Sequence, residues 1–323
     1  MGFPIVSPVI IQNLKEKLAP LTPDDFCDVV VSAAAVEYTP KLENIEIAKA
    51  IISEKETLAY GMINLPDDKS EPLVQESRKI LAKCPPAAYY WQMRTLFMSV
   101  LQNRSINIEK RFLLLNYAVK TAQGMIDNGQ AERIPKFIDE FTSAGDYTPV
   151  LDFFKQVRPN PGYSLADGIS LIKSLKKPNA AYKEVLNTIY KNLGVSGPET
   201  LKMLDMPKYI TMRKAYSDAM TSDKSIAIEN VIINYVWRYC LPLASVKFNY
   251  WEHFVFFCSL YNAIKILYTC YMPGKEDEDF AKAISAFDAA LRISDPQLMQ
   301  KVIFAMKNAG QSNNGDLAAL TLS

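Results

Sequence analysis

Two segments near the end of the chain decide its fold: ENVIINYVWRY, residues 229–239, and NYWEHFVFFCSLYNAIKILYTCY, residues 249–271. Both place apolar residues at helical spacing and carry more aromatic residues than ordinary loops do. Neither a nucleotide-binding loop nor a metal-spaced cluster stands beside them in the sequence. We therefore expect two amphipathic or buried helices here, and no local motif spells out a reaction.

Helical patterns continue over most of the remaining chain. We expect further helices from residue 44 onward, over 72–82, 87–103, 109–128, 276–292 and 296–309, with shorter ones in between. Residues 26–35 fit a helix or a short strand equally well, because Val29-Val30-Val31 favours a strand. Short connections between helices favour antiparallel neighbours. The sequence therefore predicts an all-α, multi-helix bundle with mostly antiparallel neighbouring helices.

The stretch RPNPGY, residues 158–163, is the best candidate for a linker. Two prolines and a glycine within five residues cannot continue a helix. We place a soft boundary there, between an N-terminal helical region, 1–157, and a C-terminal aromatic-rich region, 163–309. A polar, flexible tail is expected over 310–323. A single domain is the alternative.

Composition narrows the class of protein. With 323 residues, of which 49% are apolar, the chain can bury a large core. Its net charge of +1 gives no global attraction to nucleic acid or to an acidic membrane. Residues 254–272 are long enough to span a bilayer, but Asn262 and Lys265 near the middle favour a buried helix. The scattered cysteines and the absence of a secretory signal predict a cytoplasmic protein without a membrane span.

Metal binding is not expected in this chain. It has one histidine, His253, which excludes a site built from several histidines, and the spacing of its five cysteines matches no zinc or iron–sulfur pattern. The simpler interpretation of His253 is a residue at the start of a helix.

A basic segment over residues 173–214 raises the hypothesis of nucleic-acid binding. It carries nine basic side chains against three acidic ones: Lys173, Lys176, Lys177, Lys183, Lys191, Lys202, Lys208, Arg213 and Lys214. Interleaved Tyr182, Tyr190 and Tyr209 could stack on bases beside lysines that bind phosphate. Solvated helix faces explain the pattern as well.

An aromatic and acidic set near Pro242 is the candidate ligand pocket. Its members are Glu229, Tyr235, Trp237, Trp251, Glu252 and Tyr261. Aromatic faces attract ammonium and sulfonium groups, and a carboxylate adds to that attraction. Packing in the core is the alternative role for each of these side chains.

Several segments together resemble the bacterial flagellin lysine-N-methylase family. They are NIEIAKAI (44–51), LAY (58–60), QNR (102–104), EKRFLLL (109–115), ENVIINYVWR (229–238) followed by Pro242, and LYNAIK (260–265). Their order and spacing fit that family from about residue 40 to residue 305. The chain departs from the family at Asn44-Ile45-Glu46, where members carry Cys-Pro-Glu, and it shows no cysteine-rich segment before the helical body.

The resemblance implies an activity, a cofactor and a partner. It implies a protein-lysine N-methyltransferase that uses S-adenosylmethionine to methylate lysines of flagellin. No glycine-rich loop of the Rossmann methyltransferase kind is visible, so neither catalytic nor cofactor-binding residues are assigned. The alternative is a non-catalytic helical interaction protein derived from the same family, and a nucleic-acid-binding helical protein is the third hypothesis.

Overall fold

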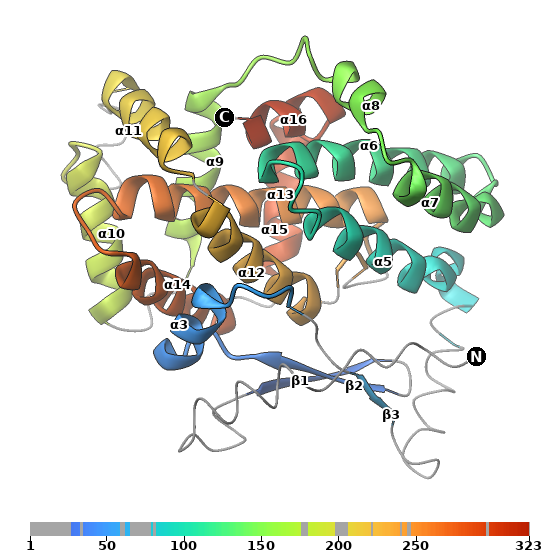
Figure 1. Ribbon diagram of the computed structural model, residues 1–323, viewed down its shortest axis with the longest axis horizontal. Helices are drawn as coiled ribbons and strands as arrows, with labels where there is room; N and C mark the ends of the chain where they lie inside the picture. The colour runs from blue at the N-terminus through green and yellow to red at the C-terminus, as the bar shows by residue number, and fades with distance from the viewer. Residues whose placement is uncertain are drawn as a thin grey trace. The chain divides into compact units, whose positions relative to one another are not determined.

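The computed structural model describes residues 27–32, 35–58, 62–64, 79, 82–175, 180–197, 206–220, 222–239, 241–243, 247–294 and 297–322. Helices make up most of these residues, which confirms the predicted all-α, multi-helix fold (Figure 1). The chain divides into two compact units. Residues 1–41, 54–150 and 229–254 form the first, and residues 42–53, 151–228 and 255–323 form the second. The predicted boundary near residue 160 stays a prediction.

The first unit contains a small antiparallel sheet of order β1-β2-β3 beside its helices (Figure 1). The strands are β1 (Cys27–Ser32), β2 (Ala35–Pro40) and β3 (Met62–Asn64). β1 pairs with β2 from Cys27 opposite Pro40 to Ser32 opposite Ala35, and β2 pairs with β3 from Ala35 opposite Asn64. The ambiguous region at residues 26–35 is thus extended where it is described, and the sheet is an addition to the predicted fold.

The helices of the first unit follow each other through short connections. They are α5 (Tyr90–Leu101), α6 (Ile108–Asp127) and α7 (Ile134–Ser143), with 3₁₀ turns at Pro85–Tyr89 and Ala131–Arg133. α5, α6 and α7 all pack on one another. Asn107 caps α6, because its Oδ1 accepts hydrogen bonds from the backbone N–H groups of Glu109 and Lys110. The helices predicted at 87–103 and 109–128 are confirmed, whereas most of 72–82 lies outside the described residues.

Two long helices carry the fold-deciding segments. They are α12 (Ser222–Arg238) and α13 (Tyr250–Ile266), and α13 continues through a π-helical turn at Leu267–Tyr271. Nearly every described residue of 229–237 and 250–272 is buried, so both segments form core, as their aromatic content predicted. Within the described residues, one helix, Tyr250–Tyr271, is long and apolar enough to cross a membrane, and its apolar window lies entirely inside the protein.

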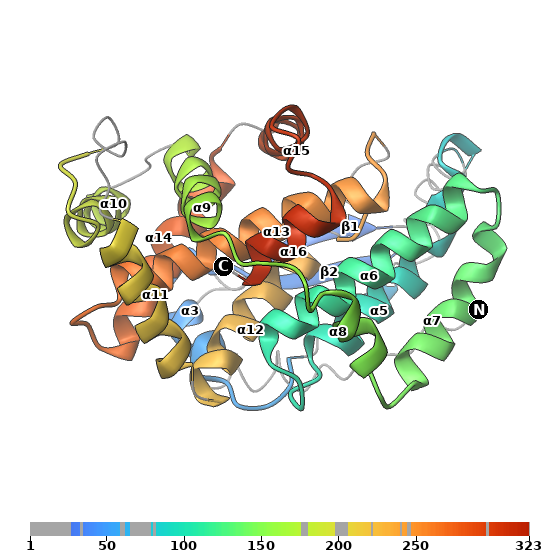
Figure 2. The same cartoon turned by 90° about the horizontal axis from the view of Figure 1, so that it is seen from above.

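The other helices lie in the second unit or at its border. They are α3 (Ile45–Ser53), α8 (Thr148–Phe153), α9 (Pro161–Ser174), α10 (Ala180–Asn192), α11 (Met206–Ala219), α14 (Asp277–Arg292), α15 (Leu298–Asn308) and α16 (Asn314–Leu322). α14 packs on α3 and α10, and α16 packs on α9 (Figure 2). The helices predicted from residue 44, at 276–292 and at 296–309 are confirmed by α3, α14 and α15.

Within 310–323, predicted as a flexible tail, the structure has the helix α16 from Asn314 to Leu322, and residue 323 lies outside the described residues. The Asn313 side chain starts this helix by accepting a hydrogen bond from the Asp316 N–H, 2.9 Å away. Leu317 and Leu320 are fully buried. Their burial in the second unit stabilises a helix that is too short to form alone in water.

Candidate functional site

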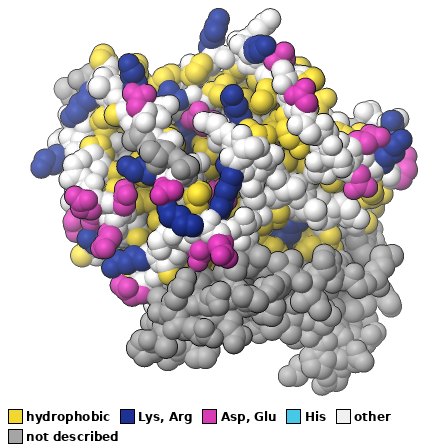
Figure 3. All heavy atoms as spheres, in the orientation of Figure 1, with side chains coloured by type: hydrophobic (Ala, Val, Ile, Leu, Met, Phe, Trp, Pro, Cys, Tyr) yellow, Lys and Arg dark blue, Asp and Glu magenta, His cyan; other side chains and the backbone are white. Residues whose placement is uncertain are grey.

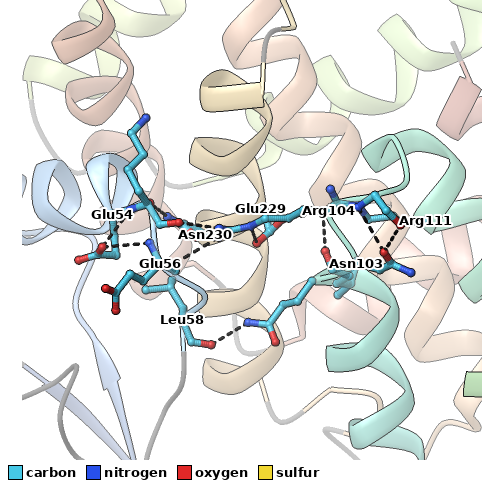
Figure 4. Close-up of polar contacts among 12 residues, drawn as sticks. Glu54, Glu56, Leu58, Asn103, Arg104, Arg111, Glu229 and Asn230 are labelled. Carbon is cyan, nitrogen blue, oxygen red and sulfur yellow. Dashed lines mark hydrogen bonds and ion pairs between the residues drawn. The ribbon is translucent and has the colours of Figure 1, made fainter.

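A buried ion cluster centres on Glu229 of α12, one of the predicted site residues (Figure 4). Glu229 Oε2 lies 2.5 Å from Arg111 Nη1, and Glu229 Oε1 lies 3.0 Å from Arg104 Nε. The Glu229 and Arg111 side chains are only 1% and 3% exposed, whereas Arg104 is 29% exposed. Arg111 also donates to the carbonyls of Leu101 and Ile106. Glu229 is therefore already paired with two cations of its own unit.

The same cluster fixes the segment 54–58 that follows α3 (Figure 4). Arg104 donates to the carbonyl oxygens of Lys55 and Glu56, at 2.5 and 3.2 Å. Asn230 Nδ2 donates to the carbonyl of Glu54 at 2.9 Å. These bonds satisfy backbone groups that an irregular segment cannot pair by itself. The cluster thus anchors 54–58 to α12.

Segments that carry the family resemblance meet at this cluster. Gln102 Nε2 donates to the Leu58 carbonyl at 2.7 Å, next to Arg104 and its contacts with Glu229 (Figure 4). Leu58, Gln102, Arg104, Arg111 and Glu229 all belong to the first unit. The sequence singled out Glu229 but not its arginine partners, because ion pairs between residues far apart in the chain leave no local signal.

The aromatic residues of the predicted pocket are buried. Two of the rings are in contact with positively charged side chains of the first unit. Arg94 lies over the Trp237 ring, with Cζ 4.0 Å from its centre, and Lys120 Nζ lies 4.7 Å from the centre of the Trp251 ring. Both tryptophans are 7% exposed. Tyr235 is fully buried, with its ring centre 5.8 Å from that of Tyr239.

The remaining predicted residues have other local partners. Tyr261, in the second unit, has Lys265 Nζ 5.5 Å from its ring centre. Glu252 starts α13 together with Asn249: the Asn249 N–H donates to Glu252 Oε2, and the Glu252 N–H donates to Asn249 Oδ1. His253 lies in the first turn of that helix, as predicted, and burial lowers the pKa of its imidazole.

These contacts bear on the methyl donor that the resemblance implies. An aromatic face or a carboxylate attracts the positive charge of a sulfonium. Three rings of the predicted pocket carry arginine or lysine side chains of the protein, and Glu229 is paired with two arginines. These residues do not fit a sulfonium in the conformation described. The ligand-binding role of the set stays a prediction.

A pocket that the sequence did not indicate lies in the second unit, between α9 and α15. Its volume is about 520 Å³, within the usual range for small-molecule sites. Asp167 of α9 lines it, and this carboxylate is held by α13: Ser259 Oγ donates to Oδ1 at 3.1 Å, and Asn262 Nδ2 donates to Oδ2 at 2.9 Å. Figure 2 shows α9 and α15 on the same side of α13.

The environment of Asp167 changes its acidity. Burial raises the pKa of this carboxyl to about 6, although the hydrogen bonds from Asn262 and Ser259 lower it. Tyr163, on the same wall, places its hydroxyl 3.2 Å from both Met306 Sδ and the Gln311 carbonyl. Burial, with Asp167 nearby, raises the pKa of the Tyr163 hydroxyl far above its ordinary value. A carboxylate with a perturbed pKa in a pocket is a recurrent mark of functional sites.

The structure also bears on nucleic-acid binding by residues 173–214 and on metal binding. Tyr182, Tyr190 and Tyr209 are 0%, 7% and 2% exposed, so they form core and leave no surface for stacking on bases. Basic and acidic side chains are interspersed on the face shown in Figure 3, over the described residues. Among the described residues, no group of three or more His, Cys, Asp or Glu side chains could hold a metal ion.

Comparison with known proteins adds one match. The family model of the FliB lysine N-methylase C-terminal domain matches residues 94–320. Searches of curated proteins and of solved structures found no match. The matched range includes α6, α12 and the α9–α15 pocket. Because it covers well over half of the chain, the protein belongs to the FliB lysine N-methylase family.

Proposed function

We propose that this protein transfers methyl groups from S-adenosylmethionine to lysine side chains of flagellin. The observation that carries the proposal is the match of residues 94–320 to the FliB lysine N-methylase C-terminal domain. We place this reaction in the cytoplasm as part of the same proposal.

The proposed reaction makes two physical demands on the protein. A lysine amine must lose its proton before it can accept a methyl group by polar transfer, although its ordinary pKa is about 10.4. The amine must also be held in line with the reacting methyl. Burial of the amine lowers its pKa, and a nearby carboxylate of moderate pKa can receive the proton. Catalytic residues for this transfer remain unassigned.

Two measurements on the full chain test the proposal. The purified protein is incubated with flagellin and S-adenosylmethionine labelled in the methyl group, and calorimetry follows binding of S-adenosylmethionine alone. We expect label on lysine Nζ and a measurable binding heat. Flagellin with acetylated lysines is the control, because its blocked amines cannot accept a methyl group. The absence of both the label on flagellin and the binding heat would overturn the proposal.

The second candidate function is a non-catalytic interaction protein built on the same helical body. The contacts of Arg94, Lys120 and Lys265 with the aromatic faces of the predicted pocket favour it, because these faces then serve packing. Capture of flagellin by the protein without binding of S-adenosylmethionine would support this function against methyl transfer.

A further inference from the structure

The walls of the α9–α15 pocket are largely aliphatic. On α9 they include Ala166 and Leu171, and on α15 they include Leu298, Val302 and Ala305. Such walls gain from packing against methylene groups, since burying apolar surface is favourable in proportion to its area. The pocket therefore suits a ligand with an aliphatic body.

Asp167 supplies a negative charge to the lining of the pocket, which also includes the exposed Lys301. Among the residues that the structure describes, the two hydrogen-bond donors to Asp167 are Ser259 and Asn262, and both are neutral. Their bonds orient the carboxylate but leave its charge without a counter-ion. The neighbouring Tyr163 keeps its proton, because burial raises the pKa of its hydroxyl. Asp167 is thus the acidic group that lines this pocket.

Other ligand classes match the pocket poorly. A divalent cation such as Ca²⁺ or Mg²⁺ takes six or more oxygen ligands, whereas one carboxylate lines this pocket. An anion would meet the charge of Asp167. A flat aromatic ligand could stack on Tyr163 alone among the residues that line the pocket, since the other apolar ones are aliphatic. A monovalent organic cation with an aliphatic body suits both the aliphatic walls and the Asp167 carboxylate.

We propose that the α9–α15 pocket binds a primary alkylammonium group, with the Asp167 carboxylate as its counter-ion and the aliphatic walls packed on its stem. Ser259 and Asn262 position that carboxylate. The ammonium could belong to a lysine side chain of a protein or to a free amine, and the two sources share this chemistry. The inference concerns binding and does not depend on the proposed methyl transfer.

The site has a defined pH dependence. Asp167 attracts an ammonium only when it is ionised, so binding strengthens as the pH rises through about 6. Cys258 of α13 lies close enough to interact with Asp167, and burial raises the pKa of its thiol well above the ordinary value, so it stays neutral. The other charged groups near the pocket are Lys301, an exposed residue of its lining, and Asp316, which interacts with Tyr163.

Calorimetric titration of the full chain tests the proposal with three probes. They are n-butylamine, Nα-acetyl-lysine N-methylamide, and Nα-acetyl-norleucine N-methylamide, which has a similar stem without the amine. Asp167→Asn removes the charge and keeps the shape. Asp152→Asn is the matched control, because Asp152 of α8 forms an exposed ion pair with Lys155, just beyond the end of that helix. Ala305→Trp places a bulky side chain in the pocket and keeps aspartate at position 167, so it tests the site even if Asp167→Asn fails to fold.

At neutral pH we expect the wild type and Asp152→Asn to bind the amine probes equally. Asp167→Asn and Ala305→Trp should weaken binding about tenfold or more, the scale set by a hydrogen bond to a charged group. Binding of the lysine probe alone assigns the site to a protein lysine, and binding of butylamine as well extends it to free amines. No binding by the wild type, or equal binding of the norleucine probe, would overturn the inference. Methyl transfer to flagellin without amine binding here would refute this inference alone.

Discussion

Substitution of Glu229 by glutamine should destabilise the protein strongly. Glutamine keeps the size of the side chain but removes the negative charge between Arg104 and Arg111. Arg111 is 3% exposed and keeps two carbonyl partners, so its charge would stay buried without a counter-ion. Breaking a buried ion pair by removing one partner costs about 3 to 5 kcal/mol. Most of this cost comes from Arg111, since water reaches Arg104.

Urea unfolding followed by circular dichroism measures the effect. Glu229→Gln should lower the midpoint with little change in the slope of the transition. Glu140→Gln is the matched control, because Glu140 pairs with Lys136 on the exposed face of α7 and should change stability by less than about 1 kcal/mol. Combining Glu229→Gln with Arg111→Met should cost less than the sum of the single changes. A loss below about 1 kcal/mol for Glu229→Gln would show that the buried Arg111 does not depend on Glu229 as its counter-ion.

The remaining predictions concern packing and acidity. Trp237→Ala should cost about 3 to 5 kcal/mol of folding stability, as truncations of buried aromatic side chains do, and a loss of only a few tenths in thermal unfolding would contradict its place in the core. Gly168→Ala should cost about 1 to 3 kcal/mol in the same assay, because its Cβ would lie 2.6 Å from Ile266 Cγ1, whereas Gly124→Ala, with open space around it, should not destabilise. The raised pKa of Asp167 stabilises the folded state at low pH, and this contribution is lost as the pH rises through about 6. Wild type should therefore lose about 1 to 3 kcal/mol of stability through this group between pH of about 4 and 7, and Asp167→Asn should not show this loss. The same pH dependence of urea unfolding in wild type and Asp167→Asn would contradict the prediction.

The helices could be predicted from the sequence where their signals are local. α6 is one case, since Asn107 starts it and its apolar residues follow helical spacing up to Gly129. Residues 26–35 stayed ambiguous because a strand is decided by its partner, and β2 supplies that partner. α16 was missed because the polar residues at its start indicate a loop, and because such a short helix depends on packing in the second unit.

The candidate sites show the same division between local and distant signals. Aromatic content identified Trp237 as a buried residue or a ring that contacts a cation, but not Arg94 as the cation, because 143 positions separate the two residues. Asp167 gave no signal in the sequence, since a single aspartate in a helix is usually exposed. Its environment is created by Ser259 and Asn262, which approach it only when α9 packs on α13.

The most direct test of methyl transfer is the mass of flagellin produced together with this protein in a host that lacks other flagellin methylases. We expect part of the flagellin to gain the mass of one methylene group for each methyl transferred, with fragment spectra placing the gain on lysine side chains. The same flagellin produced without this protein should show no gain. Flagellin of unchanged mass, in the presence of the folded protein, would contradict the proposed methyl transfer and favour the non-catalytic role.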